Sequence, residues 1–133
     1  PADDRVVRVR LWRHAAQSWS LALPGGVMDP TDADAIAAAR RELLEETGYA
    51  AEAWRYLYAA HPNPAIQTNR LHVVLATGAR RVAEPAHEAA EAIRVECPTV
   101  AELRALAGSG AIGQAMHVGA ILVALDEAGR TSR

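Results

Sequence analysis

The most informative run in this 133-residue chain is Arg41-Glu42-Leu43-Leu44-Glu45-Glu46-Thr47-Gly48-Tyr49. It closes an alanine-rich segment that begins near Thr31, and Asp34 follows Thr31 at the spacing of a capping box. Glycine is the usual residue just past a helix end, so Gly48 marks the stop. The segment therefore predicts a helix with Thr31 as its N-cap that runs to Thr47.

Three glutamates of this predicted helix share one arc, because residues three and four apart are neighbours on a helix: Glu42, Glu45 and Glu46. The adjoining arc is apolar and is expected to face the core: Ile36, Ala39 and Leu43. Like charges at this spacing repel, and the helix dipole disfavours anions near the C-terminus. A hard divalent cation such as Mg²⁺ would offset the repulsion. The alternative is a solvated face with a simple Arg41–Glu45 pair.

The remaining strands and helices follow from periodicity. Alternation predicts a half-exposed strand over Val6–Trp12, with Arg8 and Arg10 on its solvent side. Further strands are expected over Trp19–Leu23, Ala53–Ala60, Leu71–Thr77 and Ala92–Cys97. Further helices are expected over Thr99–Ala107, where Glu102 completes a capping box, and Gln114–Glu127. Interleaved strands and helices without a repeat or linker indicate one α/β domain over residues 1–133.

Composition excludes several classes of protein. The formal charge is −2, from 14 arginines against 16 acidic residues, which gives no electrostatic case for long nucleic acid or an anionic membrane. No apolar run reaches the length of a membrane span, and no signal peptide is visible. The lone Cys97 excludes an internal disulfide and fits a cytoplasmic location. The five histidines show no zinc-type spacing.

The run Arg41–Tyr49 resembles the second half of the Nudix hydrolase signature at every specified position, and Pro24-Gly25-Gly26 resembles the loop that opens the motif. The first half departs from the signature. One extra residue separates Gly26 from Arg41, and Asp32 takes the place of the family's glutamate as a shorter acid. The segment Val9–Gly26, in which Arg13-His14 precedes Leu21-x-Leu23-Pro24-x-Gly26, resembles the ADP-ribose pyrophosphatase branch of the family. The likeness extends over about residues 6–125.

This resemblance implies an α/β/α sandwich with a mixed β-sheet, and it assigns the metal ligands. These are Glu42, Glu45, Glu46 and the backbone of Gly26, holding Mg²⁺ or Mn²⁺. Glu91 is expected as the catalytic base, with Glu46 second and Glu88 as the alternative to Glu91. Arg41 is expected to orient the glutamates. Arg13, Gly25 and Gly26 are expected to contact the substrate phosphates.

The leading functional interpretation is metal-dependent hydrolysis of a diphosphate bond in a nucleoside diphosphate derivative, with ADP-ribose or a nucleotide sugar favoured. A nucleoside triphosphate or dinucleoside polyphosphate substrate is the alternative within the same chemistry. A module that binds nucleotides without cleaving them is the alternative outside it. Five aromatic residues are candidate base-stacking platforms, with core packing as the alternative for each: Trp12, Trp19, Trp54, Tyr56 and Tyr58. The oligomeric state stays open, although the branch often forms homodimers.

Overall fold

The computed structural model describes residues 4–13, 17–86 and 92–131 of the chain. Its elements in chain order are β1 (Arg8–Arg13), β2 (Ser18–Ala22), α1 (Ala35–Thr47), β3 (Tyr49–Ala50), β4 (Ala53–Ala60), β5 (Leu71–Thr77), β6 (Arg80–Arg81), β7 (Ile93–Glu96), α2 (Val100–Ser109) and α3 (Ala115–Thr131). Every predicted strand and helix is present. The pair β3 and β6 was missed, because strands of two residues are too short to show a period.

The strands form antiparallel groups. Strand β1 lies between β2 and β7, and Val9 sits opposite both Ala22 and Val95 at the centre of this sheet. Val9 is completely buried there. Strands β4 and β5 form a long hairpin, and β3 pairs with β6. All hydrogen-bonded strand pairs within the described residues are antiparallel, so the parallel pairing of a mixed sheet is not among them.

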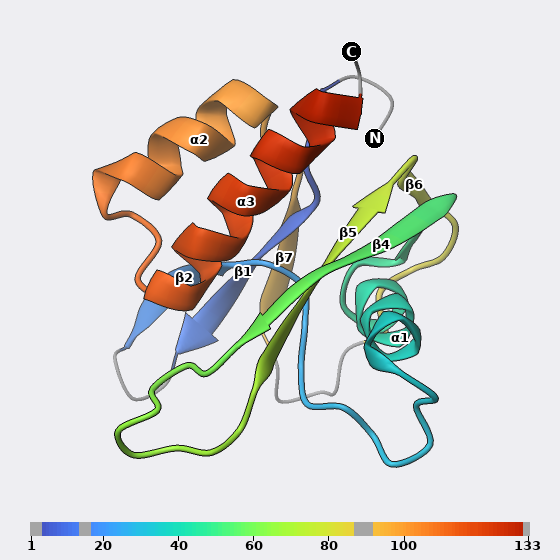
Figure 1. Ribbon diagram of the computed structural model, residues 1–133. Helices are drawn as coiled ribbons and strands as arrows, with labels where there is room; N and C mark the ends of the chain where they lie inside the picture. The colour runs from blue at the N-terminus through green and yellow to red at the C-terminus, as the bar shows by residue number, and fades with distance from the viewer. Residues whose placement is uncertain (1–3, 14–16, 87–91, 132–133) are drawn as a thin grey trace.

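Helices cover the strands on both sides, which confirms the predicted α/β sandwich (Figure 1). The β4–β5 hairpin contacts a helix on each face. On one face the guanidinium carbon of Arg40 in α1 lies 5.4 Å from the Trp54 ring centroid. On the other face Arg55 forms an ion pair of 3.1 Å with Glu127 in α3. Successive residues of a strand point to opposite faces, so Trp54 and Arg55 place α1 and α3 on opposite sides of the hairpin.

The main core cluster lies between β2, α2 and α3. Its buried members are Leu21, Leu103, Ala107, Ile112, Ile121 and Leu125. The predicted capping box starts α2: the Thr99 side chain accepts the Glu102 amide, and the Glu102 carboxylate accepts the Thr99 amide. The box fixes the start of α2, which packs with α3 in this cluster. No helix in the described part of the chain is long and apolar enough to cross a membrane.

Helix α1 begins later than predicted. Its N-cap is Asp34, whose Oδ1 accepts the Ala37 amide at 2.8 Å, so the prediction of Thr31 as N-cap is wrong. The physical reason is that Thr31 is engaged in an earlier turn, where its amide and hydroxyl both donate to Asp29. The predicted stop is confirmed. Gly48 has a left-handed φ of 73°, and its amide donates to Leu44 O at 2.8 Å.

Arg8 is a second correction, because it was expected on the solvent side of β1 and is buried. Arg10 pairs directly with Leu21, and Leu21 packs in the α2–α3 core, so α2 and α3 cover this face. Glu96 of β7 sits opposite Arg8, and its negative charge compensates for the burial of the Arg8 guanidinium. Its two carboxylate oxygens accept from Arg8 Nη2 at 2.5 Å and from Arg10 Nε at 2.8 Å.

Candidate active site

Helix α1 and the loop after β2 bring two of the three glutamates, Glu42 and Glu46, against Gly26 and Gly25. The Gly25 amide donates to Glu46 Oε2 at 3.1 Å. Gly26 lies so close to Glu42 that a Cβ atom there would be 2.5 Å from Glu42 Oε1. A side chain at position 26 would therefore displace the Glu42 carboxylate, and glycine leaves room for its close approach. The loop predicted to open the motif and the predicted glutamate helix meet in space.

Arg41 holds two of the glutamates from within the same helix. Its Nη1 donates to Glu42 Oε1 at 2.9 Å and to Glu45 Oε2 at 3.2 Å. A shared guanidinium nitrogen draws these two carboxylates together and offsets their mutual repulsion. The repulsion that suggested a metal in the sequence is thus partly relieved by the chain itself.

The other edge of the Arg41 guanidinium is occupied by Asp32. Asp32 Oδ1 accepts from Nε at 3.1 Å, and Oδ2 accepts from Nη2 at 2.9 Å. This two-point hydrogen bonding lowers the pKa of Asp32, and the Asp29 amide adds to the effect. The same partner raises the pKa of Arg41. Asp32 thus binds Arg41 from the position where the resemblance expects a glutamate.

A tight turn places Asp32 for this contact. The Asp32 amide donates to Asp29 O at 2.9 Å, and Asp32 Oδ2 accepts the Asp29 amide at 2.7 Å. The Asp32 side chain is only 7% exposed, although it lies in a loop. Arg41 is also bound to this loop through Val27 O, at 3.3 Å from Nη2. Arg41 therefore connects the loop to the glutamates of α1.

The structure brings some of the predicted site residues together, places others elsewhere, and does not describe two of them. Glu42, Glu45, Glu46, Gly25, Gly26 and Arg41 come together as predicted. Glu91 and Glu88 lie outside the described residues. Arg13 is exposed at the end of β1, and its positive charge lowers the pKa of His117. His117 itself was missed, because a lone histidine in a helix gives no signal by spacing.

His117 of α3 anchors the segment that leads into the glycine loop. Its Nδ1 accepts the Leu23 amide at 3.2 Å, two residues before Gly25. Burial lowers the pKa of His117, and the positive charge of Arg13 lowers it further. The lowered pKa favours the neutral ring, whose Nδ1 lone pair this hydrogen bond needs.

The donor atoms of the cluster suit a hard divalent cation, because all of them are oxygens. Gly26 adds a close approach with no side chain in the way. In the described residues no group of three or more His, Cys, Asp and Glu side chains is arranged as a metal site. In the same region Arg41 Nη1 donates to one oxygen of Glu42 and one oxygen of Glu45. The donor set therefore fits such an ion with Arg41 in place, because Arg41 engages one oxygen of each of these two carboxylates.

Comparison with known proteins settles the family. The NUDIX domain model matches residues 2–116. The chain is a member of the Nudix family. Two curated relatives agree with this assignment. One is a CMP-5'-(N-acetyl-N-hydroxy-3-aminopropyl)phosphonate hydrolase of Streptomyces rubellomurinus, 36% identical over 62% of this chain and 41% of its own length. The other is an ADP-ribose pyrophosphatase of Mycobacterium tuberculosis, 32% identical over 67% of this chain and 44% of its own length.

A solved structure, described as the crystal structure of ADP compounds hydrolase, shares the fold of this Nudix domain. Its TM-score is 0.85, it covers 100% of this chain and 71% of its own, and the two sequences are 22% identical. The likeness confirms the predicted α/β fold class. The Nudix chain spans less than half the length of the curated relatives it matches.

Proposed function

We propose that this Nudix domain hydrolyses a diphosphate bond in a nucleoside diphosphate derivative, with ADP-ribose or a nucleotide sugar preferred. The observation that carries the proposal is the glutamate set on α1: Glu46 and Glu42 lie against Gly25 and Gly26, and Arg41 joins Glu42 to Glu45. Both relatives support the proposal, since one is named as an ADP-ribose pyrophosphatase and the other as a hydrolase of a CMP-linked phosphonate.

Glu42, Glu45, Glu46 and the backbone of Gly26 would hold Mg²⁺ or Mn²⁺. When bound, such an ion neutralises charge on phosphate oxygens and lowers the pKa of a water molecule. Nudix hydrolases in general use divalent metal ions, and the all-oxygen donor set agrees with that chemistry. The choice between Mg²⁺ and Mn²⁺ is left to the experiment.

The chain's own residues would orient the reacting groups. Arg41 positions Glu42 and Glu45 and is itself fixed by Asp32. A carboxylate must accept the proton of the attacking water. Glu91 remains the first choice for this role, and Glu46 is the second, with one oxygen on the Gly25 amide. Arg13 would contact a substrate phosphate from the end of β1.

The test is release of phosphate-containing products from a nucleotide panel, with Mg²⁺, with Mn²⁺ and with neither. The panel holds ADP-ribose, nucleotide sugars, dinucleoside polyphosphates and nucleoside triphosphates. Glu45→Gln and Glu46→Gln should each abolish metal-dependent turnover. Glu52→Gln is the matched control, because Glu52 is exposed and its only described ion pair is a long contact of 3.8 Å with Arg80.

Each outcome favours a different interpretation. Cleavage of ADP-ribose or a nucleotide sugar supports the proposal, and cleavage of triphosphates or dinucleoside polyphosphates favours the alternative substrates. Metal binding without turnover favours a nucleotide-binding module. If Mg²⁺ and Mn²⁺ neither bind nor support turnover, the assignment of the glutamates as ligands is wrong.

We further propose that the partners are small nucleotides rather than long nucleic acid or membranes, as the charge of −2 suggests. A cytoplasmic location agrees with the single free thiol of Cys97. Homodimer formation, common in the branch that the sequence resembles, is tested by light scattering of the purified protein.

A further inference from the structure

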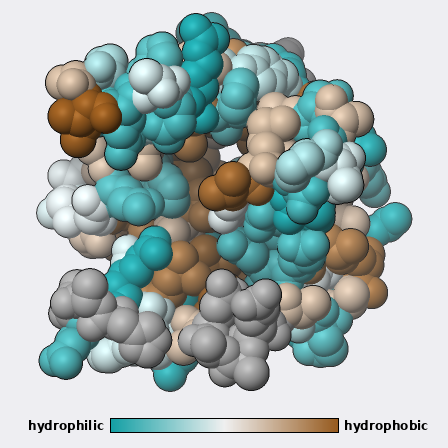
Figure 2. All heavy atoms as spheres, turned by 90° about the horizontal axis from the view of Figure 1, so that it is seen from below, coloured by the Kyte–Doolittle hydropathy of each residue, from teal (hydrophilic) through white to brown (hydrophobic). Residues whose placement is uncertain are grey.

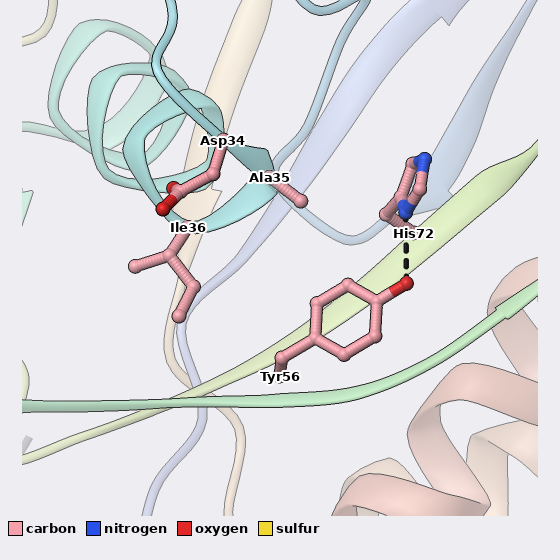
Figure 3. A pocket seen from close by; sticks show the side chains of 5 residues that line it. All are labelled: Asp34, Ala35, Ile36, Tyr56 and His72. Carbon is pink, nitrogen blue, oxygen red and sulfur yellow. Dashed lines mark hydrogen bonds between the residues drawn. The ribbon is translucent and has the colours of Figure 1, made fainter.

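A pocket of about 380 Å³ lies between the first turn of α1 and the β4–β5 hairpin (Figure 3). Its lining residues are Asp34, Ala35, Ile36, Tyr56 and His72. Figure 3 shows the Tyr56 ring and the His72 ring on the hairpin side, facing the start of the helix. None of these residues belongs to the glutamate cluster. The pocket therefore needs an explanation of its own.

The lower end of the molecule, where α1 begins, is open to a ligand. Figure 2 shows this face hollowed near its centre, with hydrophobic side chains lying deeper than the hydrophilic ones around them. The adjoining loops expose apolar side chains, with Val27 89% and Ile66 77% exposed. A nucleotide derivative can therefore enter from this end.

Tyr56 is held in the pocket although it is not buried. Its hydroxyl is 2.9 Å from His72 Nδ1, and the two ring centroids are 5.9 Å apart. The β4–β5 register shifts between Tyr56 and Tyr58, as at a β-bulge, and bulges re-aim side chains near functional sites. Tyr56 nevertheless stays 43% exposed. Its ring is thus an oriented aromatic surface that the protein leaves partly uncovered.

The chemistry of the lining favours a flat, uncharged group over a phosphate. Tyr56 provides a ring for stacking, and Ile36 provides an apolar wall. Asp34 brings negative charge, which repels phosphate. Its Oδ1 accepts the Ala37 amide, which leaves the second oxygen of the carboxylate for a hydrogen-bond donor of the ligand. A nucleobase with an amino group meets all three requirements.

The pocket also lies at a suitable distance from the glutamates. Ala35 lines the pocket, and Glu42 lies seven residues further along α1, on the same face of the helix. At 1.5 Å per residue this separation is about 10 Å along the helix axis. The ribose and phosphates of a nucleoside diphosphate can bridge that length with the base in the pocket and the diphosphate at Glu42.

We propose that this pocket is the nucleobase subsite of the enzyme, with Tyr56 as the stacking platform and Asp34 as the selector for amino-bearing bases such as adenine and cytosine. The assignment rests on the proposed function, because it takes the glutamate cluster as the diphosphate site. It also narrows that function. Adenine and cytosine nucleotides become better substrates than uracil nucleotides of the same form.

The test is a titration of the metal-free protein with AMP, CMP and UMP, followed by NMR or calorimetry, together with KM for any substrate that is turned over. Tyr56→Leu should weaken AMP binding about tenfold, whereas Tyr56→Phe, which keeps the ring, should bind as the wild type does. Asp34→Ser keeps a helix cap and removes the carboxylate, so it should reduce the preference for AMP over UMP. A melting curve confirms that each variant is folded.

Several results overturn the proposal: no AMP binding by the wild type at millimolar concentration, unchanged AMP binding in Tyr56→Leu, or equal binding of AMP and UMP. The binding readout separates this proposal from the proposed function. If no substrate is cleaved but Tyr56→Leu loses AMP, the base subsite stands and the hydrolase proposal fails. If cleavage is strong and KM is unchanged in Tyr56→Leu, the hydrolase stands and the subsite fails.

Discussion

The carboxylate of Asp32 accepts two hydrogen bonds from one edge of the Arg41 guanidinium, at 3.1 Å to Nε and 2.9 Å to Nη2. The Nη1 atom of the same guanidinium donates to Glu42 and Glu45. Asp32 therefore fixes the orientation of a cation that in turn orients two of the proposed metal ligands. A loop residue and the glutamates of α1 are coupled through a single side chain.

We predict that Asp32→Asn lowers kcat/KM by about 10- to 100-fold, the usual cost of losing a group that orients metal ligands. The amide keeps the shape of Asp32 but loses the negative charge and one of the two acceptor oxygens. Steady-state kinetics with the preferred substrate measure the effect. Asp29→Asn is the control, because Asp29 shapes the same turn through Thr31 without touching Arg41. Equal losses in both variants would point to the turn rather than to Arg41.

The two loop glycines should respond differently to alanine. In Gly26→Ala the new methyl group would lie 2.5 to 3.0 Å from the Glu42 carboxylate atoms, so Glu42 must move. A new Cβ at position 25 has no neighbour within 4 Å, and the amide that binds Glu46 remains. We expect Gly26→Ala to weaken Mn²⁺ binding and activity at least tenfold and Gly25→Ala to have little effect. Calorimetric Mn²⁺ titration and kinetics test both, and similar behaviour of the two variants would contradict this account.

Glu96 should matter for stability rather than for catalysis. It is the anionic partner of the buried Arg8, whose Nε and Nη1 atoms are buried without a hydrogen-bond partner among the described residues. Glu96→Gln leaves that guanidinium uncompensated, and we expect a loss of about 3 kcal/mol in the free energy of unfolding. Urea denaturation measures it. Glu52→Gln, at an exposed ion pair, should cost less than about 0.5 kcal/mol.

Low pH should weaken the ion pair between Glu96 and Arg8. Burial raises the pKa of Glu96, but the hydrogen bonds and positive charges of Arg10 and Arg8 outweigh it and lower the pKa below 4.5. A lowered carboxylate pKa adds stability that is present above the unfolded value and disappears as the pH falls through the folded value. The difference in unfolding free energy between wild type and Glu96→Gln should therefore shrink below about pH 4.5. If the difference in unfolding free energy between the two proteins stayed constant down to pH 3, Glu96 would not be the ionised partner of Arg8.

His117 should make the thermal stability of the protein depend on pH, in a higher pH range than Glu96 does. Its pKa is lowered from 6.5, chiefly by burial, and its neutral Nδ1 accepts the Leu23 amide. The stabilisation is fully present above pH 6.5 and is lost as the pH falls through the lower folded pKa. We expect the melting temperature of the wild type to drop more between pH 7.5 and 5 than that of His117→Gln. Parallel curves for the two proteins would exclude a role for His117 in this range.

Local patterns in the sequence predicted most of the fold. Strands β4 and β5 were predicted with their observed ends because each is long enough to show a pattern and is bounded by turn residues. The Thr99 capping box was found because its two partners are three residues apart. The N-terminus of α1 was misplaced because Thr31 and Asp34 are both good caps, and the choice depends on Asp29 and its turn.

The site was predictable only where it is local in sequence. Glu42, Glu45 and Glu46 follow from helical spacing together with the resemblance. The burial of Arg8 depends on Glu96, which is 88 residues away, and the His117 contact joins residues 94 apart. Contacts between residues so far apart cannot be predicted from the pattern within one strand or helix. The Tyr56–His72 pocket likewise exists only because β4 and β5 pair beside the start of α1.

The contact of Arg41 with Glu42 and Glu45 has a consequence for ion selection. The guanidinium acts as a built-in counterion, so an incoming cation must compete with it for the same carboxylates. Monovalent ions such as Na⁺ and K⁺ carry too little charge to compete well, whereas a divalent ion gains about twice the attraction. We therefore expect Arg41 to lower the affinity of these carboxylates for every cation, and to disfavour monovalent ions most.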